Sequence, residues 1–160
     1  MAQLKIKVFP DPDLRVKADK VKTVGQAEKD ILADMALTMY LNQGVGLAAT
    51  QVGIAKCLVV IDVGDGLIKF INPIITKKEG SQLSEEGCLS VPGECIKIKR
   101  AKTVVVSFLN EEGRPSHITG AGLLSKAIQH ELDHLSGKLI VDYLNPIKKL
   151  LKRTKSCRRI

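Results

Sequence analysis

The chain has 160 residues, of which 44% are hydrophobic and 26% are charged, and its formal net charge at pH 7 is +8. This length and composition are typical of a single folded, soluble domain that covers residues 1–160. No apolar run reaches transmembrane length and the first ten residues lack the apolar stretch of a signal peptide, which excludes membrane and secreted classes. We therefore expect a cytoplasmic protein, with cysteines that are thiols or metal ligands rather than disulfides. They are Cys57, Cys88, Cys95 and Cys157.

The first part of the chain predicts an extended arm followed by a helix. Residues 3–9 are typical of a short strand or extended arm, and the Pro-Asp-Pro-Asp sequence at 10–13 predicts a turn. A helix is expected from about residue 24 or 26 to residue 42, and Gly44 ends it. The helix has an apolar stripe at helical spacing, formed by Ile31, Leu32, Met35 and Met39.

Residues 44–53, GVGLAATQVG, are small or apolar and carry no charge. Such a run indicates that another element or a ligand approaches the backbone closely. Composition alone favours a tightly packed loop. The isolated polar residue Gln51 is the feature that this interpretation leaves unexplained.

The middle of the chain predicts strands. We expect them at 56–62, 67–71, 74–78, 96–99, 103–109 and 116–119, with a bend at Asn72-Pro73 and a polar segment at 81–90. A second helix is expected at 122–135, with Gly137 beyond its end. Its buried stripe is Leu124, Ile128, Leu132 and Leu135, and an adjoining face carries Ala127, His130, Glu131 and His134. These elements predict an α+β fold with antiparallel and mixed sheets around this central helix.

The sequence Gln129-His130-Glu131-Leu132-Asp133-His134 places two imidazoles four residues apart on one face of a helix, where both can bind one metal ion. The carboxylate of Glu131 can then reach a water on that metal without being a ligand. Two neutral nitrogen ligands beside a base are what metal-assisted hydrolysis requires.

A catalytic metal needs a third protein ligand. Downstream of His134 the chain has no Glu and no His, so the ligand is expected upstream. The plausible donors are His117, Cys57, Cys88 and Cys95. Cys88 stands out because a glycine precedes it and two acidic residues lead into that segment.

Three motifs carry a resemblance to a known family. They are GVGLAATQ at residues 44–51, EGCLS at 86–90 and QHELDH at 129–134. With these motifs in this order, the chain resembles bacterial peptide deformylases over nearly its whole length. The resemblance implies that Cys88, His130 and His134 bind a metal ion. It also implies that the native ion is ferrous iron, which nickel, cobalt or zinc can replace.

The implied activity is removal of the formyl group from the N-terminal formyl-methionine of nascent polypeptides, with release of formate. Glu131 would take a proton from the attacking water and return it to the leaving amine. The side-chain amide of Gln51 and the backbone N–H of Leu89 would stabilise the oxyanion that develops.

The resemblance also implies how substrate binds. Val45, Gly46 and Leu47 would pair with an extended substrate, main chain to main chain. The methionine side chain would enter an apolar pocket with walls from Val45, Leu123, Ala127 and the His130 ring.

The last residues are basic, and we expect 146–160 to form a C-terminal helix or tail. A solvated helix end and a contact with ribosomal RNA both fit this charge. The cations are Lys148, Lys149, Lys152, Arg153, Lys155, Arg158 and Arg159.

Two alternatives stay open at this point. One is another metal amidohydrolase on the same scaffold, because its motifs would be identical. The other is a basic nucleic-acid-binding module with a structural zinc held by Cys88, Cys95, His130 and His134.

Overall fold

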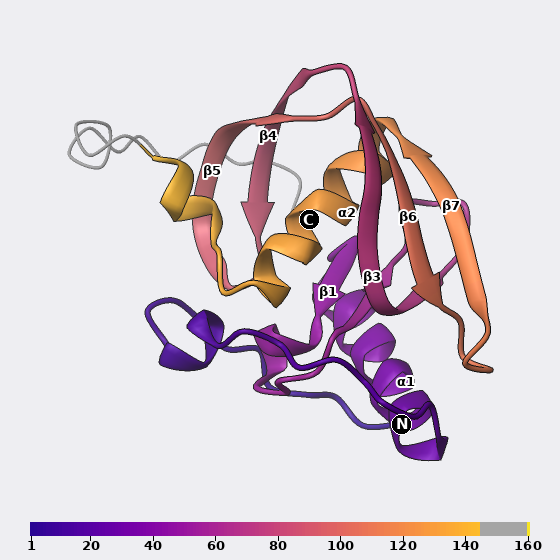
Figure 1. Ribbon diagram of the computed structural model, residues 1–160. Coiled ribbons are helices and arrows are strands. Elements are labelled where there is room, and N and C mark those ends of the chain that lie inside the picture. The colour runs from indigo at the N-terminus through magenta and orange to yellow at the C-terminus, as the bar shows by residue number, and fades with distance from the viewer. Residues whose placement is uncertain (145–159) are drawn as a thin grey trace.

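Figure 1 shows the computed structural model, which describes residues 1–144 and residue 160. Its helices are the 3-10 turns η1 (Pro12–Arg15), η2 (Ala49–Val52) and η3 (Ile140–Tyr143) and the α-helices α1 (Gln26–Leu41) and α2 (Gly122–Leu135). Its strands are β1 (Gly46–Ala48), β2 (Leu58–Ile61), β3 (Ile68–Glu79), β4 (Gln82–Cys88), β5 (Val91–Arg100), β6 (Thr103–Leu109) and β7 (Pro115–Ala121). The two predicted long helices and the α+β class are confirmed, whereas the predicted tail at 146–160 lies outside the described residues, apart from Ile160.

The strands form two antiparallel sheets, with α2 between them (Figure 1). The larger sheet has the order β1-β2-β3-β6-β7, and β4 and β5 form a separate hairpin. Strand β2 is fully buried, because its side chains alternate between two hydrophobic clusters. Val59 and Ile61 pack toward α2, whereas Leu58 and Val60 pack toward α1.

The bend predicted at Asn72-Pro73 is present, although it lies inside one strand rather than between two. Asn72 has a φ of 52°, and the β3–β6 register shifts between Ile71 and Ile74. The Asn72 side chain accepts a hydrogen bond from the Val21 N–H and donates one to the Val21 carbonyl, both at 2.8 Å. These bonds stabilise a conformation that asparagine tolerates better than most residues.

The segment 81–90, expected only to be polar, contains strand β4. Alternate residues Ser84, Glu86 and Cys88 are buried there, whereas Leu83 is 72% exposed. The hydrophobic pattern is therefore inverted, because this strand directs polar side chains inward.

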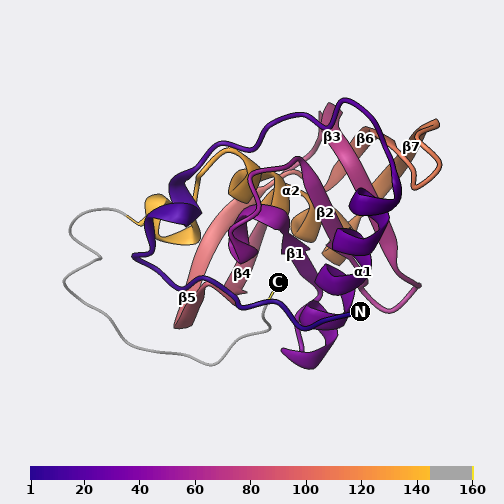
Figure 2. The same cartoon turned by 90° about the horizontal axis from the view of Figure 1, so that it is seen from below.

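The N-terminal arm is extended but joins neither sheet. Figure 2 shows it crossing from α1 to the β4–β5 hairpin. The Lys7 N–H donates to the Gln51 carbonyl and the Phe9 N–H to the Ser90 carbonyl, both at 2.8 Å. The arm thus ties together two of the three motif segments.

Helix α2 is anchored at its N-terminal half by polar contacts to Ala101, between β5 and β6. The Ala101 N–H donates to Gln129 Oε1, and Ser125 Oγ and Gln129 Nε2 both donate to the Ala101 carbonyl. Neither α1 nor α2 combines the length and apolar content needed to cross a bilayer, and no other described helix does.

Candidate metal centre and active site

Helix α2 and the end of β4 bring three potential metal ligands together. His130 Nε2 and His134 Nε2 lie 3.2 Å apart, and Cys88 Sγ lies 3.2 Å from His134 Nε2. The ligand atoms of all three residues lie within 4.8 Å of one another, and all three side chains are buried. Cys88 is therefore the donor that the structure places beside the histidine pair.

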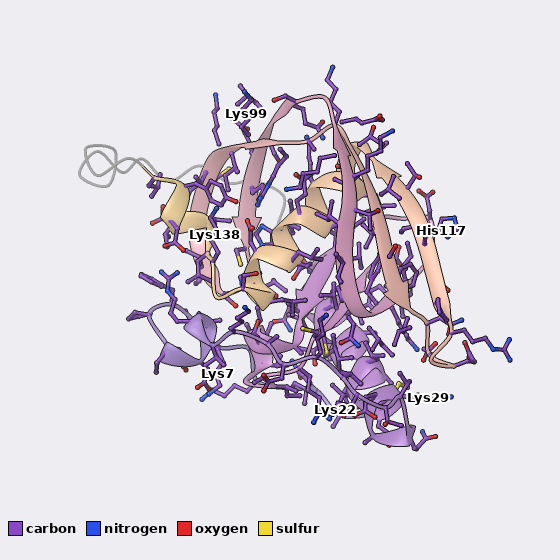
Figure 3. All side chains as sticks on the ribbon, viewed as in Figure 1. Lys7, Lys22, Lys29, Lys99, His117 and Lys138 are labelled. Atoms are coloured by element: carbon purple, nitrogen blue, oxygen red, sulfur yellow. The ribbon has the colours of Figure 1, made fainter. Side chains whose placement is uncertain are left out.

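The other upstream donors lie elsewhere. His117 is exposed on β7, at the far edge of the larger sheet (Figure 3). Cys57 is half-buried, and its Sγ contacts the Ala18 carbonyl at 3.5 Å. Cys95 is disulfide-bonded, which corrects the expectation that every cysteine is a thiol or ligand. A disulfide sulfur is no thiolate, so a Cys88–Cys95–His130–His134 zinc site is not formed.

The chemistry of the three donors fits a transition-metal ion. Burial, with Glu131 nearby, raises the pKa of the Cys88 thiol to about 12, so the thiol keeps its proton unless a cation compensates. Burial and the neighbouring His130 lower the pKa of His134 well below its usual range, which keeps that imidazole neutral. One sulfur and two neutral nitrogens suit iron, nickel, cobalt or zinc, and three protein ligands leave a position open for water or substrate.

Glu131 is fully buried beside this group without a hydrogen-bond partner for either carboxylate oxygen among the described residues. Burial, together with the charge of Glu86, raises the pKa of Glu131 well above its usual range. An unpaired buried carboxyl group is rare, because losing water without a replacement partner is unfavourable. Glu131 is therefore suited to exchanging a proton with a small molecule at this site.

The small residues of the 44–51 motif make room for the site. A Cβ atom on Gly46 would lie 2.4 Å from Glu131 Oε1, and one on Gly44 would lie 2.7 Å from Leu89 Cδ1. The close approach predicted for this run is thus made by side chains of the other two motifs. Gly46 leaves the space that the Glu131 carboxylate occupies.

Gln51 directs its amide into the same centre. Its Oε1 accepts a hydrogen bond from the Ala48 N–H at 2.8 Å, which fixes which way the amide points. Its Nε2 then faces Ser90 Oγ at 3.2 Å and Cys88 Sγ at 3.7 Å. The Gln51 side chain is fully buried, so this donor is held rigidly.

A second layer of polar residues orients His130. Glu86 Oε2 lies 2.9 Å from His130 Nδ1, and both Glu86 oxygens accept from Arg100 at 2.8 Å. With its proton on Nδ1, His130 leaves Nε2 free to bind a metal. Arg100 Nη1 also donates to Asp133 Oδ2 at 2.8 Å, so Arg100 bridges both acids.

Tyr143 completes this layer, and the sequence analysis did not find it. Its hydroxyl donates to Asp133 at 2.6 Å and accepts from Arg100 Nη1 at 3.0 Å. Tyr143 follows α2 in the chain without a motif around it. The one available signal was an aromatic residue with a polar tip directly after an acidic residue, Asp142.

Comparison with known proteins identifies this architecture. Residues 3–150 match the family model described as polypeptide deformylase. The chain belongs to the peptide deformylase family. It is 48% identical over 161 residues to peptide deformylase 2 of Xanthomonas axonopodis pv. citri, covering 97% of this chain and 95% of that protein.

Solved deformylase structures share the fold. The Legionella pneumophila enzyme has a TM-score of 0.90 and 44% identity, over 94% of this chain and 90% of that one. The Ehrlichia chaffeensis enzyme, solved in complex with actinonin, has a TM-score of 0.91 and 35% identity, over 94% of each chain.

The residues predicted to bind substrate lie on several faces around this deformylase centre. Val45 and Ala127 belong to one hydrophobic cluster, and Leu124, rather than its neighbour Leu123, packs against it. The Leu47 side chain instead packs in the cluster that contains the buried residues of α1. Val45, Gly46, Leu47, Leu123 and Ala127 remain predicted substrate contacts.

Ile160 reaches the same region from the end of the chain. Its side chain is 2% exposed and belongs to the cluster that contains Ala127. Its N–H donates to the Gly87 carbonyl at 3.1 Å, one residue before Cys88. The Gly87 carbonyl can therefore pair with a main-chain N–H from outside the β4–β5 hairpin.

Glu86 predicts a specific loss of stability in acid. Burial opposes its ionisation, but hydrogen bonds from Arg100 and His130 prevail and lower its pKa from 4.5 to about 2. The ionised form thus stabilises the fold above pH 4.5, and this contribution, about 3 kcal/mol, is lost as the pH falls from 4.5 toward 2. Because Glu86→Gln cannot take up this proton, its free energy of unfolding should depend less steeply on pH.

Urea unfolding across this pH window measures the difference. The control is Glu85→Gln, because Glu85 lies next to Glu86 on β4 but is exposed. Its pH dependence should match that of the parent. Parallel curves for Glu86→Gln and the parent would show that Glu86 is not ionised in the folded protein at low pH.

Proposed function

We propose that this chain hydrolyses the formamide of N-terminal formyl-methionine on nascent polypeptides and releases formate. The main support is the buried Glu131 carboxyl group, which has no hydrogen-bond partner among the described residues and lies beside Cys88, His130 and His134. The chain is also a member of the deformylase family. Such a carboxyl group has one evident use, which is to move a proton between water and an amine.

Cys88, His130 and His134 would hold the metal ion, which when bound would act as a Lewis acid toward the formyl carbonyl and would make a water more acidic. We propose ferrous iron as the native ion, replaceable by nickel, cobalt or zinc. The donor set is compatible with each of them.

Glu131 accepts a proton from the attacking water as the new C–O bond forms at the formyl carbon. The Gln51 amide and the Leu89 backbone N–H donate to the formyl oxygen as negative charge develops on it. Glu131 then gives its proton to the leaving nitrogen as the C–N bond breaks. The products are a free methionine amino group and formic acid, which releases the second proton of the water to solvent and leaves as formate, so water and protons balance.

The substrate binds as an extended chain along β1, an edge strand of the larger sheet. The Ile160 N–H donates a hydrogen bond to the Gly87 carbonyl, which supports a second point, on β4, at which the main chain of the substrate can pair with the protein. Backbone pairing carries no sequence information, so specificity falls to the apolar pocket that receives the methionine side chain. Val45, Leu123, Ala127 and the His130 ring are its proposed walls.

The decisive experiment measures formate released from a short formyl-methionyl peptide by protein purified without oxygen, with its metal content quantified. Glu131→Ala should keep its metal but lose about 10²–10⁴-fold in turnover, because the general base is removed. Metal loss in this variant would instead make Glu131 a ligand. A fully metallated parent that releases no formate would overturn the proposed function and favour another amidohydrolase reaction.

Val45→Phe tests the methionine pocket. A larger ring at the proposed wall should raise KM for formyl-methionyl peptides by about tenfold, the effect of losing about 1.4 kcal/mol of binding. Steady-state kinetics measure this, with Val16→Phe at an exposed site outside the pocket as the control. An unchanged KM would remove Val45 from the pocket.

We also propose that the enzyme acts in the cytoplasm and contacts the ribosome through its basic C-terminal residues. The cluster of cations after residue 147 supports a contact with RNA phosphates. Truncation after Asn145 should weaken co-sedimentation with ribosomes more than it weakens turnover of a small peptide. Equal co-sedimentation of both forms at physiological salt would exclude this role.

A further inference from the structure

A cavity of about 400 Å³ lies on the outer side of the Arg100 layer, separate from the metal centre. Three segments far apart in sequence each contribute a lysine to it: Lys78 from β3, Lys99 from β5 and Lys138 from the loop after α2. Figure 3 shows Lys99 and Lys138 on the same side of the molecule, opposite His117. The remaining described lining residues are Ile75, Arg100, Gln129, Leu132, Asp133 and Tyr143.

The charge of this cavity is not balanced from within. Asp133 is its one acidic lining residue among those described, and its Oδ2 already accepts from Arg100 at 2.8 Å and Tyr143 at 2.6 Å. Neither Lys78 nor Lys99 forms an ion pair within residues 1–144. Three lysines therefore line a concave surface whose one acidic residue among those described is already engaged.

The neighbouring lysines on the same strands behave differently. Lys77 pairs with Glu79 at 2.6 Å, and Lys97 pairs with Glu85 at 3.5 Å. Lys78 follows Lys77 directly on β3, so these two side chains project to opposite faces of that strand, whereas Lys97 and Lys99 are two residues apart and share one face of β5. Among the described lysines of β3 and β5, the two that line the cavity are the two that have no ion pair within residues 1–144.

Lys138 is held at the rim of the cavity. Its Nζ lies 3.9 Å from the centroid of the Tyr143 ring, a position in which the ring attracts a cation. The Tyr143 hydroxyl is in turn fixed by Asp133 and Arg100. One of the three ammonium groups is therefore positioned before any ligand arrives, which reduces the ordering required on binding.

We propose that this cavity binds the phosphate group of a small phosphorylated molecule. Lysine ammonium groups bind phosphate as point charges, and three of them more than balance the two negative charges of a phosphate dianion. The volume is within the range of pockets for small ligands and exceeds what a phosphate alone would fill. Ile75, Leu132 and the Tyr143 ring line the cavity as well and offer apolar surface to the remainder of the ligand.

The test is binding of inorganic phosphate to the zinc-loaded protein, followed by ³¹P NMR. In the double variant Lys78→Ser/Lys99→Ser the Kd should rise about tenfold, because two of the three cations are lost. The matched control is Lys77→Ser/Lys97→Ser, which removes the same charge from the same strands and should change the Kd less than about twofold. Both pairs are exposed, and both variants should keep the melting temperature of the parent.

Equal weakening by the two double variants would overturn the proposal, because net charge alone would then explain binding. So would a parent protein that binds no phosphate. The proposal would also be overturned if the two double variants differed in their Kd for an RNA hairpin but not in their Kd for inorganic phosphate. That result would favour an extended RNA-binding surface. None of these measurements depends on formate release. A failure of the phosphate-binding proposal can therefore be distinguished from a failure of the proposed deformylase function.

Discussion

The Glu86 carboxylate connects the β4–β5 hairpin, helix α2 and the predicted metal ligands. It accepts two hydrogen bonds from Arg100 on β5 and faces His130 Nδ1 on α2, with no exposed surface. Compared with apolar side chains of similar volume, a buried ion pair contributes little net stability, because the loss of hydration offsets most of the attraction, although protonating one partner of the existing pair is destabilising. Its value lies in orientation. A carboxylate on Nδ1 fixes both the tautomer and the rotation of His130, and so fixes where Nε2 points.

A second constraint on the site is the lack of a side chain at Gly46, rather than a hydrogen bond. Glu131 has no hydrogen-bond partner among the described residues, so its position is set by packing, and Gly46 supplies the gap that it fills. Any side chain at residue 46 would displace the carboxylate from the centre. The same strand ends in η2, whose Gln51 amide is oriented by the Ala48 N–H. One short segment thus positions both the proposed base, Glu131, and a proposed oxyanion donor, Gln51.

Sequence reasoning located the parts of the site that depend on local spacing. The interval between His130 and His134 is fixed by helix geometry, and the small-residue run around Gly46 indicated close approach without saying to what. Strand β4 escaped prediction because its inward side chains are polar, so alternation of hydrophobic residues could not reveal it. Tyr143 escaped because its partners, Arg100 and Asp133, lie on separate elements that only the tertiary fold brings together. The resemblance, rather than spacing, selected Cys88 among the possible third ligands.

Arg100 separates two regions with different chemistry. Its Nε and Nη2 donate to Glu86 on the inner side, and its Nη1 donates to Asp133 and Tyr143 on the outer side. The same guanidinium that holds Glu86 against His130 also engages Asp133, which is the one acidic residue that lines the outer cavity in the described part of the chain. A substitution at Arg100 would therefore disturb His130 and release Asp133 toward Lys138 at once. Substitutions at Lys78 and Lys99 leave the inner network intact, so the outer cavity can be altered without touching the metal ligands.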